Sequence, residues 1–216
     1  WELTYAGFSL LMIVGVVVAH GFGAGAKKEI ASGARTGLLT ALVISGPWIL
    51  MGWFLTDIMA LTDQGPEVMA VGQDYLRAMV WHLPASFMFM ALRQLVTGLS
   101  RPIIITFIMI AAVPTNLVLN IVLVFGWAGS PELGVVGAGI ATTVVAWAKL
   151  AVLVVYLARH SELSEFPPFR NLHRIDFAMW RQIWRLGLPV MAVRLVEGSM
   201  FQATFLLMGA FGATAL

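Results

Sequence analysis

The sequence predicts an all-α integral membrane protein, a polytopic bundle of six transmembrane helices, and three observations support that prediction. Hydrophobic residues make up 60% of the 216 positions and charged residues only 11%, against about 25% charged residues in an ordinary soluble domain. The apolar residues come in six long runs, each close to the roughly 20 residues that cross a bilayer core. The connections between these runs alternate between basic and acidic, which is typical of loops on opposite sides of a membrane.

The six spans follow in chain order, and the charge of each connection orients them. The first connection carries Lys27 and Lys28, the third carries Arg101, and the fifth carries five arginines, whereas the second and fourth are acidic. By the positive-inside rule, connections one, three and five are cytoplasmic. The predicted spans are residues 3–22, 37–61, 75–99, 103–127, 135–157 and 188–216.

The fifth connection is the longest and divides the chain. Pro167 and Pro168 forbid a continuous helix there. Its last part, residues 176–185, places aromatic and aliphatic residues at helical spacing with arginines between them, which is typical of an interfacial helix lying along the cytoplasmic leaflet.

These features predict three regions. We expect five spans of an amino-terminal bundle in residues 1–160, a cytoplasmic linker with the interfacial helix in 161–186, and the first helix of a carboxy-terminal bundle in 187–216. The charge pattern places Trp1 outside, and the last apolar run ends without a polar flank. We therefore expect an internal fragment of a longer protein.

Composition and motifs exclude several functions. Cysteine is absent, which excludes disulfides and cysteine metal sites. The net charge of +2 comes from connecting loops rather than from one helix face, which argues against nucleic-acid binding. The glycines of GFGAGAKK lack the spacing of a phosphate loop, and no hydrolase motif is present. We expect neither an enzyme nor a cofactor.

Polar residues inside a membrane are costly, so each one is a functional candidate. Asn116 and Asn120 lie four residues apart near the middle of the fourth span and share one helix face. Pro114 frees the carbonyl of Ile110 from its helical partner, so the sequence predicts a polar notch there. Hydrogen bonding between helices is the structural alternative for the asparagines.

Small residues recur every four positions in the fifth span, which is typical of close helix packing. Thr142 belongs to this series and lies about 10 Å below the outer end of its span, at about the depth of Asn120. We therefore expect these two residues to ligate one cation or proton carrier. The series is Gly134, Ala138, Thr142 and Ala146.

Glu197 is the one acidic residue deep in any predicted span, about 13 Å from the start of its helix at residue 188. A carboxyl group at such a position can exchange a proton or attract a cation, so we expect Glu197 to act in ion coupling. Arg194 lies on the same face, and a salt bridge between them would instead make Glu197 structural.

Three other polar residues fall inside the predicted spans. His82 is interpreted as a neutral histidine of the bundle, although it is able to titrate near neutral pH. Lys149 is interpreted as a snorkelling side chain, and Gln202 as a hydrogen-bonding partner within the bundle. No role is assigned to any of them.

Four segments of the sequence resemble a known family. They are GFGAGAKKEIASGARTGLL, ALRQLVTGLSRPIIITFIMIAAVPTNLVLNIVLVFG, LGVVGAGIATTVV and LGLPVMAVRLVEGSMFQATFLLMGAFG. In order and spacing they resemble the multidrug and toxic compound extrusion (MATE) family of antiporters, over essentially the whole chain. The resemblance implies that the six spans are helices two to seven of a twelve-helix transporter built of two bundles.

The resemblance also implies a function. It predicts a secondary active antiporter, coupled to Na⁺ or H⁺, that exports amphipathic or cationic drugs and toxic compounds by alternating access. Such a protein is a multi-pass protein of the plasma (inner) membrane, in contact with lipid and with drug-like substrates. It needs no cofactor besides the coupling ion, and we expect a monomer when full length.

Family resemblance adds roles for the candidate residues. In the family an aspartate of the first helix forms a cation or proton site with polar residues that match Asn116, Asn120 and Thr142, which implies a Na⁺ site at these three. Glu197 matches the glutamate of helix seven. Two departures stand out: some members have aspartate at the position of Asn120, and Arg194 has no counterpart.

Two alternatives stay open. A flippase for lipid-linked oligosaccharides belongs to the same superfamily, but its cavity needs several cationic residues, and the spans offer little beyond Lys149 and Arg194. A non-transport helical bundle, such as a channel or receptor, is compatible with the hydropathy alone.

Overall fold

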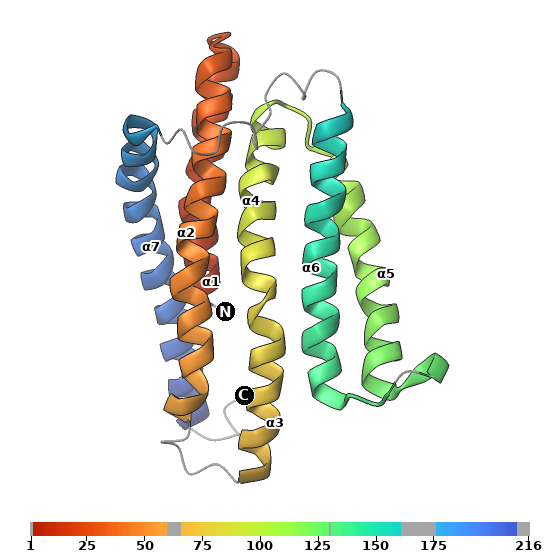
Figure 1. The fold of residues 1–216 in the computed structure, drawn as a ribbon. Coiled ribbons are helices and arrows are strands. Elements are labelled where there is room, and N and C mark those ends of the chain that lie inside the picture. Colours follow the sequence, from red (N-terminus) through yellow and green to blue (C-terminus); the bar gives the residue numbers. More distant parts are fainter. Residues whose placement is uncertain (1, 60–65, 130, 161–175, 211–216) are drawn as a thin grey trace.

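The computed structural model describes residues 2–59, 66–129, 131–160 and 176–210, and all regular structure in these ranges is helical. The helices form an elongated bundle (Figure 1). Their bounds are α1 Glu2–Gly23, α2 Lys27–Met59, α3 Pro66–Val80, α4 His82–Gly98, α5 Ile103–Phe125, the short 3₁₀ helix η1 Trp127–Gly129, α6 Gly134–Arg159 and α7 Phe177–Ala210. The prediction of an all-α bundle is confirmed.

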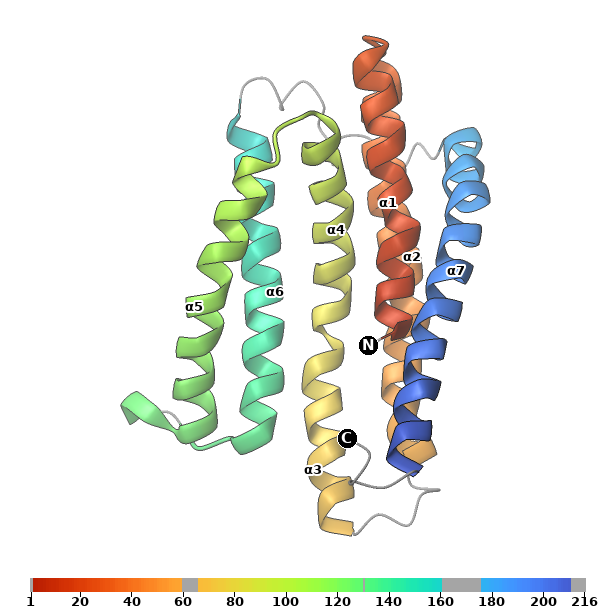
Figure 2. The same cartoon turned by 180° about the vertical axis from the view of Figure 1, so that it is seen from behind.

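Helix α4 stands at the centre of this bundle. It packs against α1 and α2 on one side and α6 on the other, while α7 packs on α1 and α2, and α5 packs on α6. Seen from either side, α1, α2 and α7 form one group and α5 and α6 another, with α4 between them (Figures 1 and 2). The buried core is therefore concentrated where α1, α2 and α4 meet, around Leu10, Val14, Leu38, Phe87 and Leu92.

Four helical segments in the described ranges are long and apolar enough to cross a membrane. They correspond to the first, second, fourth and fifth predicted spans. The segments are Thr4–Gly23, Lys27–Phe54, Ile103–Phe125 and Gly134–Arg159. The third and sixth predicted spans differ from the prediction, each for its own reason.

The third predicted span is two helices, because the chain breaks at Trp81 between α3 and α4. Pro84 has no backbone N–H and its ring clashes with the carbonyl of residue 80 in a continuous helix. Side chains satisfy neighbouring carbonyls: Thr143 Oγ1 donates to Ala78 O at 2.9 Å. Trp147 Nε1 donates to Trp81 O at 3.1 Å. Two residues of α6 therefore stabilise the break in α3/α4.

The helix that contains the sixth predicted span begins before that span, because α7 is one helix from Phe177 onward. Residues 177–185 form the first turns of α7 rather than a helix of their own, and their interfacial position stays a prediction. Met179 and Ile183 are buried in the bundle, and a Cβ on Gly187 would lie 3.2 Å from the backbone oxygen of Leu10 on α1. Part of this segment therefore packs in the bundle, whereas Phe177 is exposed.

A glycine lets α5 and α6 approach each other closely. A Cβ on Gly137 would lie 2.6 Å from the carbonyl oxygen of Leu123 on α5, a contact with backbone that no side-chain adjustment relieves. This glycine is adjacent to the predicted small-residue series rather than part of it. The close approach brings the faces of α5 and α6 that carry Asn116 and Thr142 alongside one another.

The helix ends that border the three connections predicted to be basic lie at the same end of the bundle, the upper end in Figure 1. We call it the basic end, where Lys27, Arg101 and Arg159 lie. Two contacts join helix ends there: Ser32 on α2 donates to Asp176 at 2.8 Å, and Arg101 Nη1 donates to His160 Nε2 at 3.3 Å. The alternation of connections predicted from charge is therefore reproduced by the fold.

Candidate functional site

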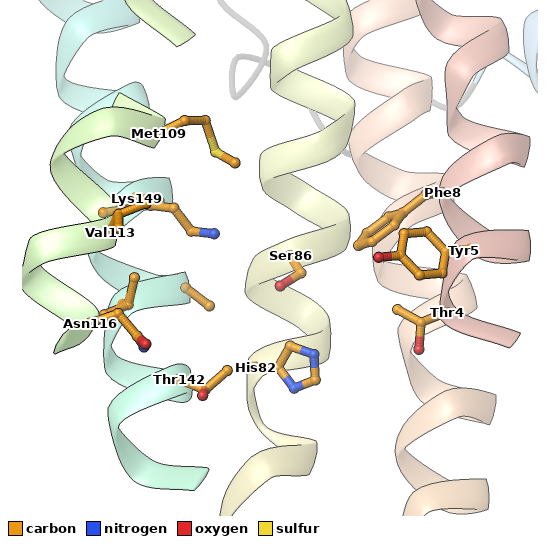
Figure 3. Close-up of a pocket in the computed structure, with 13 residues that line it drawn as sticks. Thr4, Tyr5, Phe8, His82, Ser86, Met109, Val113, Asn116, Thr142 and Lys149 are labelled. Carbon is orange, nitrogen blue, oxygen red and sulfur yellow. The ribbon is translucent and has the colours of Figure 1, made fainter. Parts of the chain in front are cut away.

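A cavity of about 430 Å³ lies between α1, α4, α5 and α6. Each helix contributes residues at helical spacing, so one face of each points into the same space (Figure 3). The polar members are Thr4 and Tyr5 from α1, His82 and Ser86 from α4, Asn116 from α5, and Thr142 and Lys149 from α6. The cavity therefore joins side chains that are up to 145 positions apart in the sequence (149 − 4).

The two asparagines of α5 are directly hydrogen-bonded. Asn120 Nδ2 donates to the side-chain oxygen of Asn116 at 2.9 Å and to its backbone oxygen at 2.8 Å. Asn116 lines the cavity, whereas Asn120 is half-buried behind it and does not. The predicted shared face is confirmed, and Asn120 orients Asn116 from one helical turn away.

Thr142 faces the cavity from α6, together with Asn116 rather than with Asn120. Its hydroxyl donates to the carbonyl of Ala138 at 2.9 Å, which leaves the lone pairs of Oγ1 available to a ligand. Asn116 and Thr142 thus present side-chain oxygens to one space (Figure 3). Neutral backbone carbonyl oxygens coordinate Na⁺ in secondary transporters, and the side-chain oxygens that Asn116 and Thr142 supply here are also neutral.

Lys149 also lies in this cavity, on the same face of α6 as Thr142 and two turns away. It is half-buried, and its ammonium lies 5.5 Å from the centre of the Phe89 ring, within the range of a cation–π contact. Lys149 stands ten residues before Arg159, about 15 Å from the basic end of α6. The interpretation as a snorkelling side chain is therefore wrong, because the side chain points inward toward α4 (Figure 3).

His82 begins α4 and lines the cavity from the break at Trp81. Its Nδ1 is hydrogen-bonded to the carbonyl of Met79, which that break makes available. A neutral ring in this arrangement donates through Nδ1 and keeps Nε2 as an acceptor. The histidine is satisfied within the bundle, as the sequence predicted, and also borders the cavity.

Glu197 does not lie at this cavity. Its Oε2 lies 3.1 Å from Nη1 of Arg194, and the two side chains are 54% and 60% exposed in this structure. Because α7 begins at Phe177, Glu197 lies 20 residues along the helix, about 30 Å, rather than the predicted 13 Å. The salt bridge considered from the sequence forms, and the structure separates Glu197 from the site of Asn116 and Thr142.

A second polar cluster lies outside the spans, at the start of α7. Asp176 Oδ1 accepts a hydrogen bond from the Met179 backbone N–H at 3.1 Å, which caps the helix, and Oδ2 accepts one from Ser32 at 2.8 Å. The Ser32 hydrogen bond, followed by that of Met179, lowers the pKa of the Asp176 carboxyl below its ordinary value. Through these two hydrogen bonds, Asp176 caps α7 and connects its start to α2.

The sequence missed the lining residues Tyr5, Ser86 and Lys149. One signal was present: Thr142, Val145, Ala146 and Lys149 recur at helical spacing on α6. Which neighbours that face meets depends on how α4 and α5 pack beside α6. Helical periodicity within one segment does not contain that information.

The comparisons with known proteins cover between about half of this chain and nearly all of it. The sequence model of the family described as MatE matches residues 1–122. A probable multidrug resistance protein NorM of Bradyrhizobium diazoefficiens is 36% identical over 210 residues, covering 97% of this chain and 45% of that protein. The multidrug resistance protein NorM of Vibrio cholerae is 32% identical over 213 residues, covering 97% of this chain and 46% of that protein.

A solved structure has a similar fold. The crystal structure of the eukaryotic MATE transporter AtDTX14 superposes with a TM-score of 0.82 at 21% identity, over 95% of this chain and 45% of that one. The chain spans about half the length of the relatives it matches. The arrangement of α1 to α7 corresponds to about half of such a protein.

Proposed function

Because the chain belongs to the MatE family of multidrug and toxic compound extrusion transporters, we propose that the full-length protein is a secondary active antiporter. It uses an inward gradient of Na⁺ or H⁺ to export amphipathic or cationic drug-like compounds. Membership confirms the prediction of a membrane transport protein rather than an enzyme. The proposal extends this to the inner membrane as its location and to export as the direction.

The cavity between α1, α4, α5 and α6 is the observation that supports this proposal. Its volume of about 430 Å³ falls within the roughly 300–1,000 Å³ of small-molecule sites. Apolar side chains such as Phe8, Met109 and Val113 share the lining with hydroxyl and amide groups. A space of this kind at mid-bilayer depth is where secondary transporters bind substrate and coupling ion.

Ion coupling is assigned to two places in this scheme. Asn116 and Thr142 offer oxygens to a cation in the cavity, with Asn120 orienting Asn116. Glu197 offers a carboxylate on α7, in competition with its Arg194 partner. Binding of the ion and of the compound to different conformations would give antiport, since a ligand shifts an equilibrium only through its differential affinity.

Dye efflux from vesicles of the full-length protein tests the proposal. Vesicles are loaded with a fluorescent cationic dye, and an inward Na⁺ or H⁺ gradient is then imposed separately. We expect efflux to accelerate with one of the gradients and to stop when an ionophore collapses it. Efflux that is independent of both gradients would overturn the antiporter assignment.

A flippase for a lipid-linked pyrophosphate is less well supported. Such a cavity needs several cations, and the described lining contains Lys149 and, when protonated, His82. Failure of dye efflux combined with binding of a lipid-linked pyrophosphate would favour that alternative.

A further inference from the structure

Helix α6 supports the junction between α3 and α4 along one of its faces. Gly139, Thr143 and Trp147 follow one another at four-residue spacing, so they lie on the same face of α6. A Cβ on Gly139 would lie 3.1 Å from the backbone oxygen of Tyr75, so α3 packs closely on α6 there. Other residues of α6 line the cavity. One helix therefore both borders the cavity and supports the junction.

Two side chains on this face satisfy carbonyl groups of the junction. Thr143 Oγ1 donates to Ala78 O at 2.9 Å, and Trp147 Nε1 donates to Trp81 O at 3.1 Å. A backbone carbonyl without a partner is costly inside a membrane, and side chains of neighbouring helices are one means of satisfying those that a helix break frees. These two hydrogen bonds hold the chain on both sides of the residues between Ala78 and Trp81.

The carbonyl of Met79 lies between these two points in the chain and is hydrogen-bonded to Nδ1 of His82. A carbonyl oxygen only accepts, so Nδ1 carries the proton, and Nε2 of the neutral ring is an acceptor. In water, a histidine without such a partner favours the opposite form, with the proton on Nε2. The tautomer of His82 is therefore set by its bond to the Met79 carbonyl, which the two bonds from α6 hold in place.

The direction and tautomer of His82 matter because of where it lies. His82 lines the cavity between α1, α4, α5 and α6 (Figure 3) and also a second cavity of about 340 Å³ between α1, α2, α3 and α4. Thr4 lines both cavities as well. With the proton on Nδ1, His82 offers an acceptor to an O–H or N–H group, whereas the opposite tautomer offers a donor. The bonds at the junction therefore decide the hydrogen-bonding character of His82.

We propose that Thr143 and Trp147 are positioning residues of the transport cavity: they fix the α3–α4 junction so that His82 presents Nε2 to the cavity as a hydrogen-bond acceptor. This inference rests on the proposed function, because it treats the cavity as the transport site. Neither α6 residue is among the described residues that line the cavity, so both act through His82. Loss of their hydrogen bonds releases the Met79 carbonyl and shifts His82 toward the tautomer with the proton on Nε2.

The first test measures the tautomer of His82. Full-length protein with ¹³C,¹⁵N-labelled histidine is examined in nanodiscs by solid-state NMR at about pH 8.5, above the ordinary histidine pKa of about 6.5. The signals of His82 are assigned by their loss in His82→Gln. Thr143→Val and Trp147→Phe each remove a donor, and Thr143→Ser keeps the hydroxyl. Thr115→Val is the matched control, because the hydroxyl of Thr115 donates within α5, to Ala111 O.

We expect the proton on Nδ1 of His82 in the unaltered protein, in Thr143→Ser and in Thr115→Val. Combining Thr143→Val with Trp147→Phe should raise the ratio of the Nε2–H to the Nδ1–H form at least about threefold, the effect of one hydrogen bond in a membrane bundle. Each single variant should shift the ratio in the same direction by less. A ring with its proton on Nε2 in the unaltered protein would overturn the proposal. An unchanged ratio with a lower thermal midpoint would show a structural role alone and would overturn it too.

The second test asks whether Thr143 acts through His82 in transport. Thr143→Val should slow dye efflux by about threefold in the unaltered protein and should have no further effect in a protein that carries His82→Gln, because residues that act as a unit are not additive. Equal losses in the two backgrounds would overturn the positioning role. The tautomer is measured without an ion gradient, so failure of gradient-driven efflux overturns the antiporter assignment and leaves the NMR result standing.

Discussion

Asn120 donates its side-chain N–H to Asn116 Oδ1 at 2.9 Å, one turn apart on α5, and this bond fixes how Asn116 faces the cavity. The donated hydrogen bond occupies one lone pair of the Asn116 oxygen and leaves the other available. The pair therefore acts as a unit, in which the residue behind the cavity positions the residue that lines it.

Asn116→Leu should reduce cation-driven dye efflux by about tenfold, the effect of losing one hydrogen bond or ligand to a charged group. Thr115→Val is the matched control, because Thr115 donates to Ala111 O at 2.8 Å on the exposed side of the same helix. Folding should change little in either variant, since bundle hydrogen bonds contribute about 0.6 kcal/mol on average. Equal efflux from the two variants, measured in vesicles at matched protein content, would contradict a coupling role for Asn116.

The sequence predicted this pair because both residues lie on one helix, where four-residue spacing fixes their relation. Sequence analysis failed where the position of a residue depends on how a second helix packs against its own. The break at Trp81 follows from Pro84, but the mean hydropathy of a window of residues does not register a single proline. The carbonyls that the break frees accept hydrogen bonds from Thr143 and Trp147 of α6. Lys149 was misjudged for the same reason, since its direction depends on the packing of α6 against α4.

Segment 176–185 shows a second limit of sequence analysis. Apolar residues at helical spacing define a buried face, but not whether lipid or protein covers it. The structure places Met179 and Ile183 in the bundle core and Gly187 against Leu10 of α1. The division of the chain into two bundles stays a prediction.

Gly137→Ala should destabilise the packing of α5 against α6. The added Cβ would lie 2.6 Å from the carbonyl oxygen of Leu123, and we expect an overpacking cost of about 1–3 kcal/mol. Gly46→Ala is the control, because nothing lies within 4 Å of a Cβ at that position of α2, and alanine favours a helix interior by about 0.5–1 kcal/mol. Thermal unfolding of the full-length protein in detergent should show a lower midpoint for the first variant only; similar midpoints would refute the close contact.

Asp176→Ala should loosen the start of α7. Loss of a helix cap costs about 1 kcal/mol, which corresponds to about fivefold faster amide exchange in the first turn. Hydrogen–deuterium exchange of the full-length protein at Met179 and its neighbours measures this effect. Ser32→Ala should give a smaller effect at neutral pH, because the cap to Met179 remains.

The contribution of Asp176 should also depend on pH in a defined direction. Its pKa is lowered in the folded protein, first by the Ser32 hydrogen bond, so the stabilisation is complete above the ordinary aspartate pKa of about 3.9 and is lost as pH falls through the lower folded value. The exchange difference between the unaltered protein and Asp176→Ala should therefore be constant from neutral pH to about pH 5. In a protein that also carries Ser32→Ala, this exchange difference should begin to shrink at a higher pH, because the hydrogen bond that lowers the pKa of Asp176 most is missing. Loss of the exchange difference near neutral pH would contradict the lowered pKa of Asp176.

Glu197 and Arg194 offer a test that separates coupling from structure. Their contact of 3.1 Å joins two side chains that are more than half exposed in this structure, and exposed pairs contribute about 0.2–1 kcal/mol. If the carboxylate exchanges a proton or holds a cation, Glu197→Gln should reduce gradient-driven efflux by at least about tenfold. Arg194→Gln removes the same ion pair but keeps the carboxylate, so its efflux should fall by less than about threefold, as expected from the small energy of the pair. Both rates are measured in vesicles under the gradient that drives the unaltered protein, and equal losses in the two variants would show that the pair has a structural role instead.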